Sequence, residues 1–170
     1  AGKSPLLKLL AGLYTPSAGS ITLGGLDLSQ IAEETLRRNI GYLSQNARLV
    51  RGSLRDSLTM GLAGVSDDDL IAVAQATGLD ALFAGGQRGL DAELQEGGAG
   101  LSGGQRALVA LNRLIHGAPS IWLLDEPTAA LDAASEKAAL DAVRLNPAPL
   151  RTRLAKLPDR PLHILDRTPG

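Results

Sequence analysis

Apolar positions recur with two different periods along this chain, and together they predict a mixed α/β fold. Residues 6–13 carry leucines at helical spacing around a glycine at position 12, which predicts an amphipathic helix that ends near there. Shorter apolar runs at residues 20–23 and 39–45 predict strands. The run at 120–124 is apolar without alternation, as expected for a central parallel strand that is covered on both faces.

Helices with polar starts account for much of the remaining chain. Ser66 and the aspartates at 67–69 precede an apolar stretch, where a hydroxyl and carboxylates complement the positive end of a helix. We interpret this acidic triplet as a solvated helix start rather than a metal site. Helices are expected at residues 31–38, 70–76, 79–83, 105–115 and 135–144, and a hairpin turn is expected at residues 24–25.

Composition restricts the class of protein. With 170 residues, 44% of them hydrophobic, and a net charge of −1, the sequence has the size and balance of one soluble globular domain or most of one. Near-neutral charge gives no electrostatic argument for a nucleic-acid partner. The sequence contains no cysteine, so disulfides and thiol chemistry are excluded. No apolar run reaches the ~20 residues of a membrane span. Because the sequence starts without Met, inside a motif, we expect a piece of a longer protein.

The stretch Leu101-Ser102-Gly103-Gly104-Gln105 joins a glycine-rich loop to a run with helical spacing. A hydroxyl residue followed by glycines at a helix start is a ready anion site, because free N–H groups and the positive end of the helix dipole point outward there. An ordinary serine N-cap on a core helix explains the same residues. The choice between these interpretations depends on the other motifs.

Two further motifs carry groups that phosphate chemistry needs. Gly2-Lys3-Ser4 is the second half of the pattern G-x-x-x-x-G-K-[ST], in which Lys reaches the β and γ oxygens and Ser or Thr holds Mg²⁺. Asp125 and Glu126 end an apolar strand, at the edge where open α/β sheets bind ligands. In a phosphate-loop ATPase such an Asp binds Mg²⁺ through water, and the adjacent Glu polarises the attacking water as general base.

In their order and spacing, these motifs resemble the nucleotide-binding (ATPase) domain of ABC transporters over about residues 1–145. The resemblance implies an α/β fold: a P-loop NTPase core with a mostly parallel sheet, plus a helical subdomain that carries the ABC signature. The core would comprise about residues 1–54 and 106–170, and the helical signature subdomain about residues 55–105. Segments after the predicted strand at 39–45 and before the signature resemble exporters, most closely type I secretion transporters.

The resemblance also implies roles for single residues. Glu126 is the expected general base, and Gln45 is expected to help hold Mg²⁺ and the attacking water. Ser4, Gln45 and Asp125 are the expected Mg²⁺ ligands. The residues expected to bind ATP are Gly2, Lys3, Ser4, Ser102, Gly103, Gly104, Gln105 and Asp132.

The same resemblance implies two partners and a location. The signature would close on the ATP held by a second ABC ATPase domain, in a head-to-tail dimer. A transmembrane permease domain, in the same full-length chain, would be moved by that dimer. The domain would then lie at the cytoplasmic face of the plasma membrane.

After Val143 the resemblance fades. The strand expected within residues 162–167 places Asp166 at the position of the family's switch histidine, and His163 takes that role only after a local realignment. A carboxylate cannot donate a hydrogen bond to the γ-phosphate at neutral pH and repels it. Asp166 therefore favours an alternative, a degenerate domain that binds ATP without efficient hydrolysis.

Two more hypotheses stay open, together with the roles of three single residues. A soluble ABC-type ATPase of DNA repair or translation tends to carry zinc-binding cysteines or coiled-coil insertions, which this sequence lacks. It is also open whether these residues fold alone, because the strand before the phosphate loop normally lies at the sheet centre. Among single residues, Glu96 is either a contact to the membrane domain or a solvated carboxylate. Arg113 takes the place of an Arg in the family's signature helix or is solvated or ion-paired. His116 is expected at the surface.

Overall fold

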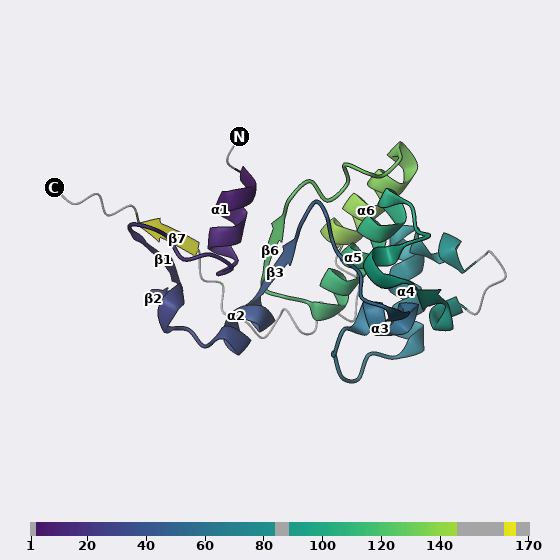
Figure 1. Cartoon of the computed structure of the whole chain (residues 1–170), viewed down its shortest axis with the longest axis horizontal. Coiled ribbons are helices and arrows are strands. Elements are labelled where there is room, and N and C mark those ends of the chain that lie inside the picture. Colours follow the sequence, from purple (N-terminus) through teal and green to yellow (C-terminus); the bar gives the residue numbers. More distant parts are fainter. Residues whose placement is uncertain (1–2, 84–88, 146–161, 166–170) are drawn as a thin grey trace.

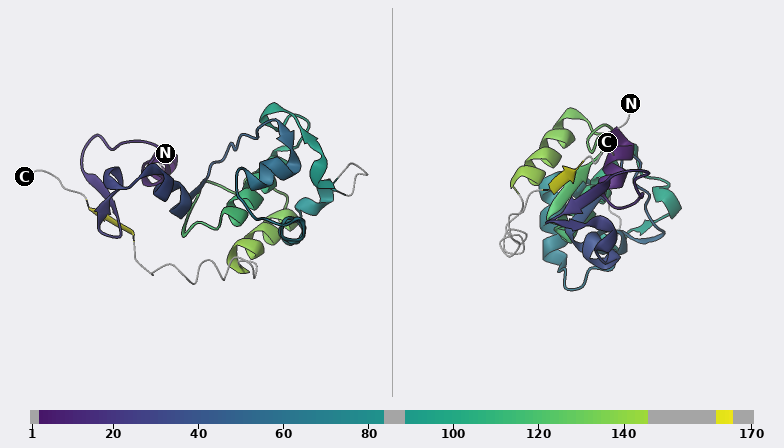
Figure 2. Two further views of the ribbon diagram at one scale, coloured as in Figure 1. Left: turned by 90° about the horizontal axis from the view of Figure 1, so that it is seen from below. Right: turned by 90° about the vertical axis from the view of Figure 1, so that its left-hand side faces the viewer.

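A computed structural model describes residues 3–83, 89–145 and 162–165 of the chain. The helices are α1 (Lys3–Leu10), α2 (Glu33–Asn39), α3 (Leu54–Thr59), α4 (Asp67–Thr77), α5 (Gly103–Gly117) and α6 (Ala133–Leu145), and the strands are β1 (Ser20–Leu23), β2 (Leu26–Asp27), β3 (Ile40–Leu43), β4 (Gly52–Ser53), β5 (Glu93–Leu94), β6 (Ile121–Leu124) and β7 (Leu162–Leu165). Two lobes lie on either side of the neighbouring strands β3 and β6 (Figure 1). The first lobe holds α1, α2, β1, β2 and β7, the second holds α3 to α6, and the same separation is visible from below in Figure 2.

The pair β3–β6 is parallel, as the sequence predicts, and it connects the two lobes. Its register pairs residues 40–43 with residues 121–124 one to one. Helix α5 packs against β3 at Gly41, where a Cβ atom would lie 2.2 Å from Leu114 Cδ1 and 2.4 Å from Pro119 Cγ. Only glycine fits such an approach without a shift of the helix. The carboxyl ends of both strands meet at one edge, and polar residues follow each strand there.

The first lobe packs α1 and α2 against β1, β3 and β6. Its buried residues are Leu10, Ala11, Ile21, Leu28, Leu36, Ile40 and Leu123. Strands β1 and β2 form an antiparallel hairpin, as predicted. Gly24 and Gly25 turn this hairpin with φ angles of 60° and 86°, values that glycine adopts at little cost.

Strand β7 forms within the segment where the sequence predicts a strand, but it pairs antiparallel with β1. Its end at Leu165 lies opposite Ser20, and His163 lies opposite Thr22. The strand thus extends the hairpin sheet and does not join β6. Asp166 and Gly2 lie outside the described residues.

The second lobe is the larger hydrophobic cluster and is mainly helical. Its most deeply buried hydrophobic residues lie on α3 to α6 and on the short helix that follows α4, and they are Leu54, Leu58, Leu70, Ala74, Leu79, Val109, Leu111, Ile115 and Ala139. Strands β4 and β5 pair antiparallel at its edge. No helix in the described ranges is long and apolar enough to cross a bilayer.

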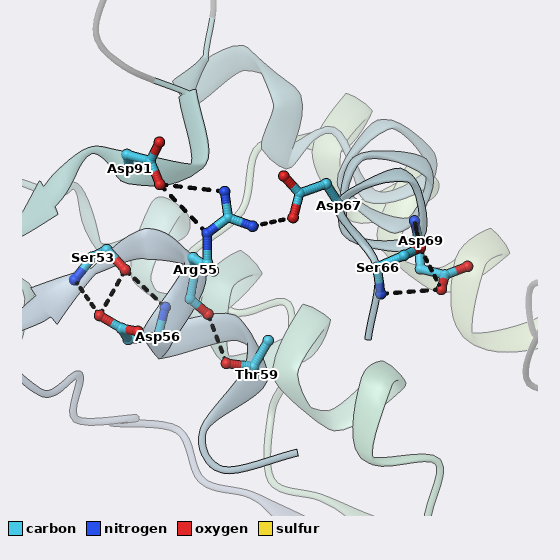
Figure 3. Close-up of polar contacts among 8 residues, drawn as sticks. All are labelled: Ser53, Arg55, Asp56, Thr59, Ser66, Asp67, Asp69 and Asp91. Atoms are coloured by element: carbon cyan, nitrogen blue, oxygen red, sulfur yellow. Dashed lines mark hydrogen bonds and ion pairs between the residues drawn. The ribbon is translucent and has the colours of Figure 1, made fainter. Parts of the chain in front are cut away.

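Three helices of this lobe, α3, α4 and α5, begin with reciprocal caps, and Figure 3 shows those of α3 and α4. The Ser66 hydroxyl accepts from the backbone N–H of Asp69, and the Asp69 carboxylate accepts from the Ser66 N–H, which starts α4. Arg55 on α3 forms ion pairs with Asp67 and, at 3.2 Å, with Asp91 (Figure 3). The acidic triplet therefore acts as a helix start, as interpreted, and within the described residues no cluster of potential metal ligands is found.

The prediction that His116 lies at the surface is wrong. Helix α5 continues to Gly117, which brings His116 one turn after the buried Asn112, and the His116 side chain is only 5% exposed. Burial lowers the pKa of His116 from its ordinary value of 6.5, although the Asp69 carboxylate opposes this shift. Arg113 is half-buried and donates from Nε to the Ser57 carbonyl at 2.8 Å, and it forms no ion pair with the side chains that the structure describes.

Candidate functional site

The residues that follow β3 and β6 meet at one edge of the parallel pair. Gln45 lies two residues beyond β3, and Glu126 lies two residues beyond β6. Gln45 Nε2 donates a hydrogen bond to Glu126 Oε2 at 2.9 Å. Between them, the backbone N–H of Asp125 donates to the Leu43 carbonyl at 2.9 Å, which continues the strand pairing into the site. Two residues that are 81 positions apart are thereby joined.

The backbone of Glu126 is unusual. Its φ of 52° lies in the left-handed region, which costs a residue with a side chain on the order of 1 kcal/mol or more. A tight turn holds this conformation, since the Ala129 N–H donates to the Glu126 carbonyl at 3.2 Å. The Glu126 side chain is exposed, beside a cavity of about 190 Å³ that Gln45 and Ala130 also line. The carboxylate is thus presented to a hollow with room for water.

Asp125 differs from its neighbour because it is buried, with 9% of its surface exposed. The Tyr42 hydroxyl donates to Asp125 Oδ2 at 3.4 Å. Burial, followed by the nearby Asp125 charge, raises the pKa of Tyr42 above its ordinary value. Among the side chains that the structure describes, from residue 4 onward, no ion-pair partner of the Asp125 carboxylate is found. A buried carboxylate of this kind fits a bound cation, because hard divalent cations prefer carboxylate oxygens.

The signature stretch forms the start of α5, and its residues are held by a reciprocal cap. The Ser102 hydroxyl accepts from the Gln105 N–H at 3.1 Å, and Gln105 Oε1 accepts from the Ser102 N–H at 2.8 Å. Gly104 lies against the segment after Glu126, since a Cβ atom there would stand 2.8 Å from the Ala130 carbonyl oxygen. Ser102 is thus the N-cap of α5, and this cap leaves the N–H groups of Gly103 and Gly104 without an intrahelical partner, so a cap and an anion site are compatible here.

Asp132 caps the next helix. Its Oδ1 accepts from the N–H groups of Ala134 and Ser135, at 3.0 and 2.9 Å, and its Oδ2 accepts from the Ser135 hydroxyl at 2.9 Å. The bonds from Ser135 hold the pKa of Asp132 below its ordinary value. Asp132 therefore remains ionised at the start of α6, where a negative charge is favourable.

A family model described as ABC transporter matches residues 1–129 of the chain. The chain belongs to the ABC transporter family. Its fold is that of the family's ATP-binding domain, a P-loop NTPase fold, as predicted.

Several relatives of this ABC transporter chain are exporters or transport proteins. A human protein described as ATP-binding cassette sub-family B member 6 is 38% identical over 138 residues, which is 81% of this chain and 16% of the relative. A Lactococcus lactis protein described as lactococcin transport/processing ATP-binding protein LcnC-like is also 38% identical over 138 residues, 81% of this chain and 19% of the relative. The chain thus spans less than a fifth of the length of these two relatives.

Among solved structures, a bacterial Atm1-family ABC exporter with ATP bound is similar to this chain, with a TM-score of 0.79 and 32% identity. The likeness covers 85% of this chain and 26% of that one.

The structure brings together three of the predicted ABC transporter site residues, and it places three others at the starts of helices. Gln45, Asp125 and Glu126 gather at the strand ends. Lys3 and Ser4 form the first turn of α1, and Ser102 lies at the start of α5. Gly2 and Asp166 fall outside the described residues.

Sequence reasoning missed one residue at this edge, Tyr42. The sequence held no signal for it, because its place depends on the strand register, in which Tyr42 pairs with Leu123, two positions before Asp125. Side chains two positions apart along an extended segment lie on the same side.

Proposed function

We propose that this chain binds Mg²⁺-ATP and hydrolyses it as the motor domain of an ABC exporter. The observation that carries the proposal is the 2.9 Å hydrogen bond between Gln45 and Glu126 beside the buried Asp125 carboxylate. Glu126 offers a base, Gln45 orients it, and Asp125 offers a negative charge for a cation. This is the set that phosphoryl transfer to water requires.

In this proposal Lys3 and Ser4 at the start of α1 hold the phosphates, and Ser4 and Asp125 hold Mg²⁺. ATP supplies the γ-phosphoryl group that is transferred, and Mg²⁺ neutralises its charge. Glu126 accepts the proton of the attacking water on its free Oε1, while Gln45 fixes the carboxylate through Oε2. Positioning and charge neutralisation supply the rate, and no covalent intermediate with the chain is needed.

A head-to-tail pair of ATPase domains would complete the site. The free N–H groups of Gly103 and Gly104 at the start of the 15-residue helix α5 suit the γ-phosphate of a nucleotide held by the other subunit. Ser102 and Gln105 support this role by fixing the first turn of the helix. Asp132 supports it by fixing the segment that lies against Gly104.

A membrane permease domain is the proposed second partner. A groove of about 450 Å³ lies beside the loop that carries Gln45, and its lining mixes apolar side chains with arginines. The lining residues are Arg37, Gly41, Tyr42, Leu43, Ser44, Ala47, Arg48, Met60, Ala110, Arg113, Leu114, Gly117 and Pro119. A helix of the permease fits such a groove, and the domain would then work at the cytoplasmic face of the plasma membrane. Since one relative is described as a lactococcin transport protein, we propose peptide or protein secretion as the process served.

Mg²⁺-dependent ATP hydrolysis by the purified protein tests the proposal, with Glu126→Gln beside the wild type. We expect turnover to fall by about 10²- to 10⁴-fold, because the amide cannot accept the proton, while ATP still binds. Glu34→Gln is a matched control, since Glu34 is an exposed residue of α2 that forms an ion pair with Arg38. Its turnover should equal that of the wild type. Equal turnover in wild type and Glu126→Gln would contradict the assignment of the base.

One observation favours a second candidate, a domain that binds ATP without efficient hydrolysis. Strand β7 extends the β1 hairpin sheet, so the strand that leads to Asp166 does not lie next to β6. In that case the wild type binds ATP, and its turnover is as low as that of Glu126→Gln. Turnover should then stay low in Asp166→His as well, and its restoration would contradict the placement of the strand as the cause.

A further inference from the structure

We infer that Tyr42 is a positioning residue of the nucleotide site, whose hydroxyl fixes the Asp125 carboxylate for the divalent cation. The inference rests on the proposed function and adds a residue to it. Its basis is the hydrogen bond that the Tyr42 hydroxyl donates to Asp125 Oδ2, at 3.4 Å.

The position of Tyr42 follows from the strand register. Tyr42 pairs with Leu123, and Asp125 follows two positions later on the neighbouring strand. The Tyr42 ring packs against the buried cluster of the first lobe, which α1 also builds. The ring is therefore anchored by apolar contacts, and these contacts aim its hydroxyl at the end of β6.

The hydrogen bond controls the orientation of a carboxylate that has few other partners. Asp125 is buried, and among the side chains described from residue 4 onward the Tyr42 hydroxyl alone donates to it. A bond to Oδ2 restricts the rotation of the carboxylate plane and engages only one of its two oxygens. A cation or its water then meets an oxygen that is already oriented, so less ordering is needed on binding.

A positioning role for Tyr42 differs from a purely structural role, because it affects the affinity for the metal ion and not the fold. Loss of the hydroxyl leaves the ring and its packing intact, so the fold and the binding of metal-free nucleotide should persist. Groups that orient metal ligands typically change metal affinity by about 10- to 100-fold when they are removed. Because this bond is long, we expect an effect at the lower end of that range.

The test is Mn²⁺ binding by the purified protein in the presence of a non-hydrolysable ATP analogue, followed by the electron paramagnetic resonance signal of free Mn²⁺. Tyr42→Phe should weaken Mn²⁺ binding about tenfold, with unchanged affinity for the analogue in EDTA and an unchanged melting temperature. Tyr14→Phe is the matched control, because Tyr14 is the other tyrosine of the chain and is 57% exposed. Its Mn²⁺ affinity should equal that of the wild type.

The three ways in which this test can fail are distinguishable. Equal Mn²⁺ affinity in the wild type and Tyr42→Phe overturns the inference and leaves the proposed function standing. An equal loss of affinity for Mn²⁺ and for the metal-free analogue also overturns it, because that result indicates a general disturbance of the site. A wild type that binds neither Mn²⁺ nor the analogue contradicts the proposed function itself, and the inference with it.

Discussion

The strand-end site and the start of α5 are built in opposite ways. Gln45 and Glu126 are 81 positions apart and meet because β3 and β6 run parallel and end at the same edge. Ser102 and Gln105 are three positions apart and would meet in any helix that starts at this sequence. The first arrangement depends on tertiary packing and the second on local chemistry. Substitutions that disturb packing should therefore affect the two regions unequally.

The largest effect is expected from Gly41→Ala. The new methyl group would overlap with the side chains of Leu114 and Pro119, so these must shift away from β3. We expect a loss of about 1–3 kcal/mol of unfolding free energy, as for overpacked cores, and a loss of ATP turnover. Urea denaturation and an ATPase assay measure the two quantities.

Gly117→Ala is the matched control for that substitution. Gly117 ends α5, and a Cβ atom there would have no neighbour closer than 3.9 Å. Stability and turnover should stay close to those of the wild type. Equal losses in the two variants would show that the β3–α5 contact does not determine the strand-end site.

A smaller effect is expected from Ser102→Ala, which removes the α5 cap. Loss of a serine cap typically costs about 1 kcal/mol of stability. Ser66→Ala removes the equivalent cap of α4, where the hydroxyl also accepts from the third residue of the helix. Thermal melts should show similar losses for both variants, while ATP turnover should fall in Ser102→Ala alone. Similar turnover in the two variants would contradict a role of the signature residues in ATP hydrolysis.

The smallest effect is a pH dependence confined to the helical lobe. Burial lowers the pKa of His116, so the folded state binds a proton less readily than the unfolded chain does. The stability contribution of neutral His116 is fully present above its ordinary pKa of 6.5 and is lost as pH falls below it toward the folded pKa. The Asp69 charge limits this loss of stability, because it opposes the lowering of the His116 pKa.

Melting temperatures between pH 8 and pH 5 test this dependence, with His116→Leu as the comparison. The wild type should lose stability below about pH 6.5, and the variant should show a flatter profile over the same range. Parallel profiles would mean that other groups cause the pH dependence.

Local pattern was sufficient to predict much of this molecule. Unbroken apolar residues marked β6, and a serine followed by acidic residues marked the start of α4, because these features depend on the immediate neighbours in the chain. The meeting of Gln45 with Glu126 could be predicted as well, because parallel strands place their carboxyl ends together. The family resemblance supplied the remaining roles.

Some features depend on partners that a sequence pattern does not name. The pattern indicated a strand at β7 but could not choose β1 as its neighbour. His116 is buried because α5 extends beyond the predicted end at residue 115, which keeps it on the inner face of the helix. The Tyr42–Asp125 bond depends on the register between two strands and is invisible until that register is known.

The central claim is that Gln45 and Glu126 act as one unit, and a double-mutant cycle tests it most directly. Single-turnover ATP hydrolysis would be measured for Gln45→Ala, Glu126→Gln and the double variant beside the wild type. If Gln45 works by orienting the Glu126 carboxylate, the double variant should be no slower than Glu126→Gln alone. Reductions that multiply in the double variant would contradict the account, because the two residues would then act independently.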